Sequence, residues 1–156
     1  MQTEELNPLN LTSKKSRHQD KRLFFLFNMA RHHLFGYVDA ECDAQLGISV
    51  TQAGALLYIA KKEGCYQKDL GDALGLKKST VTGLVSRMEK NGLVKRKACK
   101  QDGRASTLFL SQLGNEIIPR IILFIKSIND EFLSDFSDEE MDVIFKFLNR
   151  IIKKYS

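Results

Sequence analysis

The sequence predicts a mainly α-helical fold in which three short helices and a β-hairpin form a winged helix-turn-helix. Two short segments, 66–75 and 78–92, carry apolar residues at helical spacing and are separated by only a few residues, with Gly75 supplying the turn, which is typical of a helix-turn-helix. After the second segment the apolar period changes to two on both sides of an Asp-Gly turn, which predicts a β-hairpin. With a helix at 49–64 in front, we expect this unit to span residues 49–110.

Long apolar helices are expected on both sides of this unit. The segment 19–41 is apolar over much of its circumference, so it needs more than one packing partner. Two further helices follow the hairpin, 111–136, which we expect to be irregular near Pro119, and 137–156. A small winged helix cannot cover so much apolar surface, so we expect a dimer. The expected division is a flexible tail (1–18), dimerisation helices (19–48 and 111–156) and the winged helix (49–110).

Two of these helices have a defined start. Ser49 is followed three residues later by Gln52, and Ser137 by Glu140. In such a capping box the serine hydroxyl accepts a hydrogen bond from the backbone of the first turn, while the longer side chain bonds back to the backbone of the serine. We therefore expect a helix to begin directly after each serine.

The positive charge of the chain is concentrated in its middle third. Residues 61–104 contain 12 basic and 5 acidic side chains, whereas the rest of the chain contains 12 and 14. A basic centre between near-neutral flanks favours contact with a polyanion at the centre and another role for the ends.

The remaining composition points to a cytoplasmic protein without membrane contact. No apolar run reaches the roughly 18 residues that a membrane span needs, and the polar N-terminus lacks the apolar core of a signal peptide. The cysteines, Cys42, Cys65 and Cys99, are odd in number and widely spaced, so we expect reduced thiols rather than a disulfide framework.

The basic centre contains the residues that a DNA-reading helix and its wing require. In a helix-turn-helix the start of the second helix reaches base edges in the major groove, and short hydroxyl side chains let the backbone approach the phosphates. A hairpin arginine can enter a narrow minor groove, where the potential is most negative. We expect Arg96 to face away from these contacts and to cover the core. The candidates for DNA contact are Lys77, Lys78, Ser79, Thr80, Thr82 and Gly83 on the helix, and Lys95, Lys97, Lys100 and Arg104 on the hairpin.

These residues lie in a stretch that resembles the MarR family of bacterial transcriptional regulators. The resemblance rests on "LGLKKSTVTGLVSRMEKNGLVKR" followed by "DGRASTLFLSQLG". The family's pattern is a recognition helix that ends in a Leu/Met-Glu-x-x-Gly-Leu-Val turn, a wing with Asp-x-Arg, and a Leu-Thr-x-x-Gly entry to the next helix. Ser111 stands here in place of that threonine. The resemblance covers about residues 20–156.

The resemblance implies a homodimer whose terminal helices intertwine and whose two winged helices bind a near-palindromic operator in double-stranded DNA. It implies that Arg104 contacts the minor groove and that Asp102 pairs with Arg87 on the recognition helix, so that both join the candidate DNA site. It also implies a repressor that is released by a small, often aromatic, effector bound between the dimer helices and the winged helix. The candidate effector contacts, chosen as aromatic or polar residues near that junction, are Phe27, Arg31, His33, Tyr37 and Tyr58.

Two other functions remain open at this point. Some members of the family sense oxidants through a cysteine early in the first helix, whereas Cys42 lies near the far end of that helix. A winged helix can also serve as a protein-interaction module, although a basic, hydroxyl-rich recognition helix favours DNA. No set of nucleophile, base and acid indicates an enzyme, and no cofactor is expected. A metal site is not expected either, because the adjacent His32 and His33 face different sides of a helix.

Overall fold

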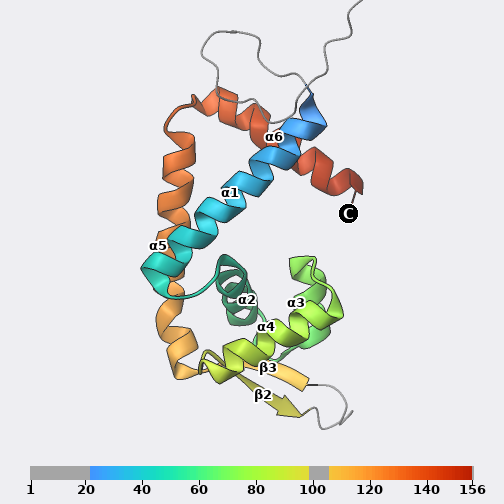
Figure 1. The fold of residues 1–156 in the computed structure, drawn as a ribbon, viewed down its shortest axis with the longest axis vertical. Helices are drawn as coiled ribbons and strands as arrows, with labels where there is room; N and C mark the ends of the chain where they lie inside the picture. The colour runs from blue at the N-terminus through green and yellow to red at the C-terminus, as the bar shows by residue number, and fades with distance from the viewer. Residues whose placement is uncertain (1–21, 99–105, 156) are drawn as a thin grey trace, which may run out of the picture. The chain divides into compact units, whose positions relative to one another are not determined.

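The computed structural model describes residues 22–98 and 106–155, so the predicted tail, 1–18, lies outside the described part. The described elements form the predicted mainly α-helical winged helix-turn-helix, preceded and followed along the chain by long helices (Figure 1). Their bounds are α1 Leu23–Leu46, α2 Val50–Lys61, β1 Cys65–Tyr66, α3 Gln67–Leu74, α4 Lys78–Lys90, β2 Val94–Ala98, β3 Ser106–Leu110, α5 Gln112–Leu133 and α6 Asp138–Tyr155.

The chain divides into two compact units, Met1–Leu34 and Phe35–Ser156, and α1 runs through both. The helix continues to Leu46, beyond the predicted end at residue 41, because Cys42 is fully buried and the turn comes only at Gly47, whose φ is 69°. In the described part of the first unit, the exposed large apolar side chains are Leu23, Phe24, Phe25, Leu26, Phe27 and Leu34.

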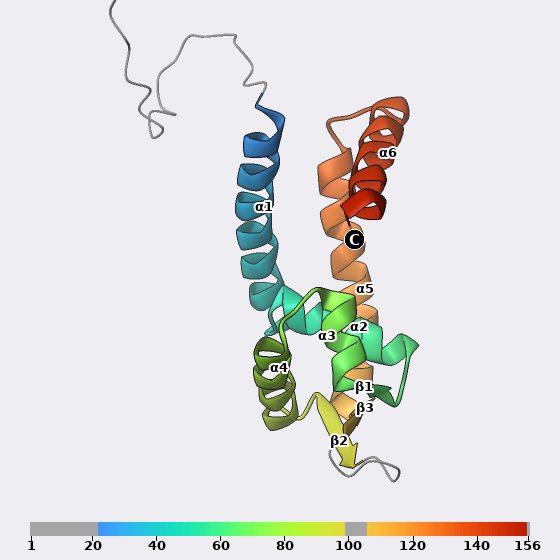
Figure 2. The ribbon, with the colours of Figure 1, turned by 90° about the vertical axis from the view of Figure 1, so that its right-hand side faces the viewer.

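The winged helix belongs to the second unit. Its three strands form an antiparallel sheet in the order β1-β3-β2, which lies on one side of α2, α3 and α4, at the lower end of Figures 1 and 2. Gly75, in the left-handed conformation with a φ of 63°, ends α3 and makes the turn to α4. The largest fully buried side chains of the winged helix are Leu56, Ile59, Leu70, Val85, Met88 and Leu108.

Both predicted capping boxes are confirmed. At the start of α2 the Ser49 Oγ accepts a hydrogen bond from the Gln52 N–H (3.2 Å), and the Gln52 Oε1 accepts one from the Ser49 N–H (2.9 Å). At the start of α6 the Ser137 Oγ accepts from the Glu140 N–H (3.3 Å), and the Glu140 Oε2 accepts from the Ser137 N–H (2.9 Å). These bonds satisfy backbone donors that the first turn of a helix otherwise leaves unpaired.

The start of α5 is fixed to the turn that follows α4. The Ser111 hydroxyl donates to the Gly92 carbonyl oxygen and accepts from the Gly114 N–H, and the Ser111 N–H donates to the Leu93 carbonyl oxygen. A Cβ on Gly114 would lie 2.1 Å from the Leu93 carbonyl oxygen, so only glycine allows this approach. The Ser-x-x-Gly sequence at residues 111–114 therefore holds two parts of the fold together.

The expectation of an irregular helix near Pro119 is wrong. The helix α5 is continuous from Gln112 to Leu133 although Pro119 lies inside it. A proline removes one backbone hydrogen bond, but Ile117 and Ile121 are buried on either side of it and hold the helix against the core. Pro119 itself is exposed, so its ring occupies no space that the core needs.

Candidate nucleic-acid interface

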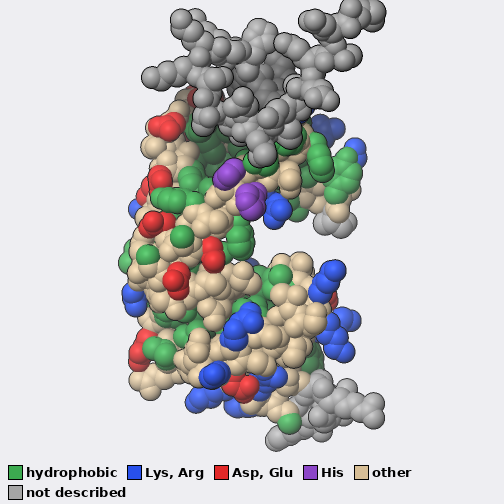
Figure 3. All heavy atoms as spheres, in the orientation of Figure 1, with side chains coloured by type: hydrophobic (Ala, Val, Ile, Leu, Met, Phe, Trp, Pro, Cys, Tyr) green, Lys and Arg blue, Asp and Glu red, His purple; other side chains and the backbone are tan. Residues whose placement is uncertain are grey.

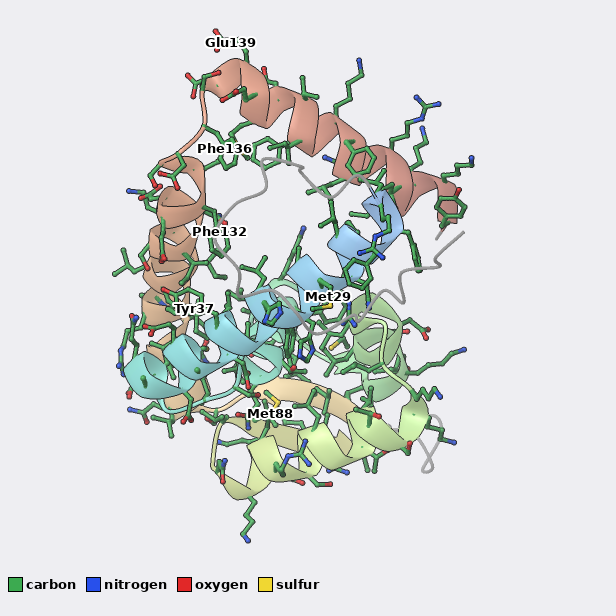
Figure 4. All side chains as sticks on the ribbon, turned by 45° about the horizontal axis from the view of Figure 1, so that its top comes forward. Met29, Tyr37, Met88, Phe132, Phe136 and Glu139 are labelled. Carbon is green, nitrogen blue, oxygen red and sulfur yellow. The ribbon has the colours of Figure 1, made fainter. Side chains whose placement is uncertain are left out.

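The helix α4 presents one apolar and one polar face. Val81, Leu84, Val85 and Met88 are each no more than 2% exposed, and Met88 points into the winged helix in Figure 4. Because these positions recur at helical spacing, they place the residues between them on the outside. The predicted recognition helix is therefore anchored by its apolar residues and turns its small polar and basic residues toward solvent.

Basic side chains gather over the winged helix. Lysines and arginines cluster in the part of the molecule that holds α3, α4 and β2, at the lower end of Figure 3. Most of their side chains are exposed, so their charge is accessible to a polyanion. The exposed cations in residues 61–98 are Lys61, Lys62, Lys68, Lys77, Lys78, Arg87, Lys90, Lys95 and Lys97.

The first turn of α4 is open to an anion. Lys77 is the N-cap residue, and no side chain accepts a hydrogen bond from the first turn of α4. The side chains of Ser79 and Thr80 are exposed and make no hydrogen bond within residues 22–98 and 106–155. Backbone donors at a helix start, together with the helix dipole, attract negative groups. These residues and Lys78 thus form the kind of surface that phosphates and base edges require.

Thr82 has a structural bond that the sequence did not reveal. Its Oγ1 donates to the Lys78 carbonyl oxygen (2.9 Å) and accepts from the Gln67 Nε2 (2.9 Å). The hydroxyl proton is thus used inside the protein, and the bond from Gln67 ties the start of α3 to α4. Its predicted contact with DNA, which stays a prediction, is restricted to accepting a hydrogen bond in this arrangement.

Gly83 and Arg87 lie together on the outer side of α4. A Cβ on Gly83 would stand 3.6 Å from the Arg87 Nη1, so the guanidinium lies beside the glycine, toward the start of the helix. A contact at 3.6 Å is an ordinary van der Waals distance, and the fold therefore does not require glycine at this position.

The described part of the wing has lysines on one face. Lys95 and Lys97 alternate along β2 and are exposed, and the Lys97 Nζ lies 4.3 Å from the centre of the Phe109 ring. The predicted contacts Lys100, Asp102 and Arg104 lie outside the described residues, as does Cys99. The pairing of Asp102 with Arg87 therefore stays a prediction.

Arg96 of the described wing contacts two residues of α4. Its Nη2 donates to the Ser86 Oγ (2.6 Å), and its Nε lies 3.2 Å from the Glu89 Oε2. We expected Arg96 to turn away from the lysines, which it does, but we did not foresee that it joins β2 to α4. The available signal was the spacing of Ser86 and Glu89, which puts both on one flank of the helix.

A groove of about 720 Å³ lies between α3, α4 and the wing. It is lined by apolar and charged groups of both signs, so it is neither a purely basic channel nor a closed apolar cavity. Its lining residues are Tyr66, Gln67, Lys68, Asp69, Gly71, Asp72, Leu76, Lys78, Val81, Thr82, Arg96 and Ser106. Gln67 and Lys68 are candidate contacts for DNA that the sequence analysis missed, because they lie in α3 rather than in the recognition helix.

The predicted effector contacts fall in both units. Phe27, Arg31 and His33 belong to the first unit and are exposed. In the second unit, Tyr37 points from α1 toward α5 (Figure 4), and its hydroxyl donates to both carboxylate oxygens of Glu131, at 3.1 and 3.0 Å. This bond raises the pKa of Tyr37.

The fifth candidate, Tyr58, is half-buried and has the Lys62 Nζ 5.4 Å from the centre of its ring. Neither Tyr37 nor Tyr58 lines the groove beside α4 or a second groove of about 640 Å³ between the end of α1, the turn after α4 and the start of α5. The structure therefore leaves the effector contacts a prediction.

The two described cysteines are poorly suited to react with oxidants. Cys42 is 0% exposed and Cys65 is 9% exposed, and both are free thiols. Burial, with a smaller effect of Asp39 and Asp43, raises the pKa of Cys42, and burial, followed by the charge of Asp69, raises that of Cys65. A raised pKa leaves less of the reactive thiolate at neutral pH.

Two kinds of site are not found in the described part of the chain. Among residues 22–98 and 106–155, no three His, Cys, Asp or Glu side chains are grouped closely enough to hold a metal ion. In the same residues, no helix is both long and apolar enough to cross a membrane.

Comparisons with known proteins identify relatives of this arrangement. A family model described as the MarR family matches residues 46–105, which include the helix-turn-helix and the first strand of the wing. The transcriptional regulator HosA of Escherichia coli O111:H- is 30% identical over 101 residues, which make up 65% of this chain and 75% of HosA.

Solved structures share the fold at lower identity. The MepR–DNA complex of S. aureus has a TM-score of 0.79 at 22% identity, with 88% of this chain and 100% of that chain covered. The PcaV transcriptional regulator of Streptomyces coelicolor, in complex with its natural ligand, has a TM-score of 0.75 at 23% identity, with 87% of this chain and 95% of that chain covered. At these identities the likeness concerns the fold.

We predict that Cys42 and Cys65 resist alkylation in the native protein. Their raised pKa values mean that the thiolate fraction at pH 7–8 is below that of a free cysteine, and burial blocks access as well. Iodoacetamide labelling followed by peptide mass mapping should show slow modification of both thiols in the native protein and rapid modification after unfolding in guanidinium. Rapid labelling of Cys42 without unfolding would reopen redox sensing through this residue.

Proposed function

Because the chain belongs to the MarR family of DNA-binding transcriptional regulators, we propose that it acts as a homodimeric repressor of a near-palindromic operator and that a small effector releases it. The observation that carries this proposal is the exposed start of α4, where Ser79 and Thr80 stand beside an open helix terminus on the basic side of the molecule. The proposed arrangement places α4 in the major groove and the wing in the adjacent minor groove. The DNA complex of MepR, which has the same fold, supports DNA binding by this fold.

The dimer is supported by the apolar surface of the last two helices. No residue of α6 is buried, and the side chains of Ile122, Leu123, Val143 and Ile152 are between 55% and 67% exposed. Covering such side chains contributes about 25 cal/mol for each Å² of apolar surface removed from water. A second copy of the chain with the same exposed helices provides that cover.

We propose Tyr37 and Tyr58 as effector contacts in the second unit, whereas Phe27, Arg31 and His33, which belong to the first unit, stay predictions from the sequence. A carboxylate or phenol that bonds to the Tyr37 hydroxyl would compete with Glu131, which now accepts its hydrogen bond. The effector would thereby weaken a link between α1 and α5. The structure of PcaV with its natural ligand supports a ligand-responsive member of this fold.

The proposal predicts that the protein sediments as a dimer. Analytical ultracentrifugation at micromolar concentration should give about twice the chain mass of 17.8 kDa, because the apolar faces of α5 and α6 associate. Replacing Val143 and Ile152 by lysine should shift the protein to the monomer, whereas the charge change Lys153→Glu at a neighbouring exposed position should not. A stable, soluble wild-type monomer would contradict the proposal.

The proposal also predicts an operator affinity that depends on the wing and on salt. Duplexes selected from random DNA should contain half-sites about one helical turn apart, and affinity should fall steeply with salt because about 6–10 phosphates are neutralised per dimer. Arg104→Ala should weaken binding by roughly 1–3 kcal/mol per lost contact without changing the melting temperature. Thr80→Ala should instead change the base preferred at one position. A titration of labelled operator at several salt concentrations measures both.

Near-wild-type operator affinity of a folded Arg104→Ala variant would refute the role of the wing. Selection of no common sequence would leave the interaction-module alternative as the better explanation of the fold. Loss of base preference without loss of salt dependence in Thr80→Ala is the pattern expected of a residue that reads bases rather than phosphates.

Gly83 provides a test in which stability and binding change in opposite directions. A glycine inside a helix costs about 1 kcal/mol relative to alanine, and a Cβ at Gly83 meets only the end of the Arg87 side chain, at 3.6 Å. We therefore expect Gly83→Ala to raise the free energy of unfolding and to weaken operator binding, because the methyl group keeps the DNA away from the helix. Gly54→Ala is the matched control, since its Cβ also makes an ordinary contact at 3.6 Å but lies in α2. Unchanged operator affinity in Gly83→Ala would show that DNA does not approach this position closely.

A further inference from the structure

In the described part of the wing, one long side chain of β2 reaches across to the recognition helix. Along β2, Val94 is buried, whereas Lys95, Lys97 and Ala98 are exposed. Arg96 lies between these exposed residues and is half-buried, because its side chain crosses to α4. It is therefore the outermost described residue through which β2 is held against the helix.

The contact combines a hydrogen bond with a partly exposed ion pair. The Arg96 Nη2 donates to the Ser86 Oγ at 2.6 Å, and the Nε lies 3.2 Å from the Glu89 Oε2. The Nε is buried from water and has no well-aligned hydrogen bond, so the carboxylate of Glu89 offsets its charge mainly through proximity. Removing that carboxylate leaves the partly exposed guanidinium without its nearest counter-charge and leaves the buried Nε without a neighbouring acceptor.

The two partners of Arg96 lie on the flank of α4 that is next to the wing. Ser86 and Glu89 are three residues apart and therefore neighbours on one side of the helix, while Gly83 and Arg87 approach each other elsewhere on its surface. The contact with Arg96 thus leaves the outer face of α4 uncovered. It fixes the angle between β2 and α4 without using any of the predicted DNA contacts on either element.

We propose that Arg96 is a positioning residue for DNA binding, held by Glu89 and Ser86 so that the wing and the recognition helix reach adjacent grooves of one duplex together. This inference rests on the proposed function, because it assigns the relative placement of the two elements that contact DNA. Without this contact β2 could tilt against α4, and a tilt would change the direction in which the chain leaves Ala98 toward the predicted contact Arg104, which follows in the sequence. Fixing the tilt before binding removes an ordering cost from the complex.

The direction in which Glu89→Gln changes DNA affinity distinguishes a positioning role from a general electrostatic effect. Glu89→Gln removes a negative charge from a DNA-binding domain, so general attraction to the phosphates predicts tighter binding. Positioning predicts weaker binding, because the amide no longer offsets the charge of Arg96 and the wing is released. Glu63→Gln is the matched control, since Glu63 is an exposed carboxylate of the same winged helix and its removal changes only the general charge.

The experiment is a double-mutant cycle on the full-length protein with the operator duplex recovered in the selection described above. Wild type, Glu89→Gln, Arg104→Ala and the double variant are titrated at two salt concentrations, and their melting temperatures are measured. We expect Glu89→Gln to weaken binding about tenfold, and the double variant to bind about as well as the weaker single variant, because residues in one coupled unit are non-additive. Glu63→Gln should bind at least as tightly as wild type.

Ser86→Ala keeps the inference testable if Glu89→Gln unfolds. Ser86 is exposed, so the alanine variant is expected to fold, to weaken binding severalfold, and to show the same coupling with Arg104→Ala. Arg96→Lys should bind the operator more weakly than the wild type, because an ammonium cannot reach both partners as a guanidinium does.

The outcomes distinguish the inference from the proposed function. Suppose that Arg104→Ala weakens binding by an amount that simply adds, in free energy, to the effect of Glu89→Gln or Ser86→Ala. In that case Arg96 and its partners do not position the wing, and this inference is overturned while the proposed function stands. The same holds if Glu89→Gln tightens binding as much as Glu63→Gln does. If Arg104→Ala has no effect in a folded protein, the proposed role of the wing fails, and the inference fails with it.

Discussion

The burial of one face of α4 is the constraint on which the proposed DNA-facing surface depends. Val81, Leu84, Val85 and Met88 are almost inaccessible to water, and burying such a side chain contributes roughly 1.5–3 kcal/mol. A helix cannot turn about its axis without exposing these residues, so the rotation of α4 is fixed. The outward direction of its small and basic residues is therefore a consequence of core packing, and no interaction of the polar residues themselves is needed to achieve it.

The same helix is connected to the long helices through its far end. The carbonyl oxygens of Gly92 and Leu93, just after α4, accept hydrogen bonds from Ser111, and Gly114 lets α5 start directly against them. Movement of α5 along its axis would break these bonds or move the end of α4. These bonds are therefore a direct connection between the start of α5 and the end of the recognition helix.

Most of the fold follows from local sequence signals, whereas the contacts across elements do not. The capping boxes of Ser49 and Ser137 could be predicted from the residue three positions later. The turn at Gly75 could be predicted from its place between two segments with apolar residues at helical spacing. The end of α1 was placed too early because the burial of Cys42 depends on tertiary packing. The contact of Arg96 with Glu89 was missed for a similar reason, since the angle between a hairpin and a helix is not encoded in either element alone.

Exposed apolar residues and exposed basic residues lie on different elements of this molecule. This separation favours different roles for the long helices and for the winged helix. Within the described winged helix, 49–98 and 106–110, Tyr66 is the only exposed large hydrophobic side chain, while α5 and α6 expose many. A module that binds proteins through α4 needs an apolar centre in its contact surface, and α4 offers hydroxyls and cations instead. The hydrated cations suit an anionic partner that keeps its own water, as DNA does. Apolar association is thus left to the long helices, and recognition of a polyanion to the winged helix.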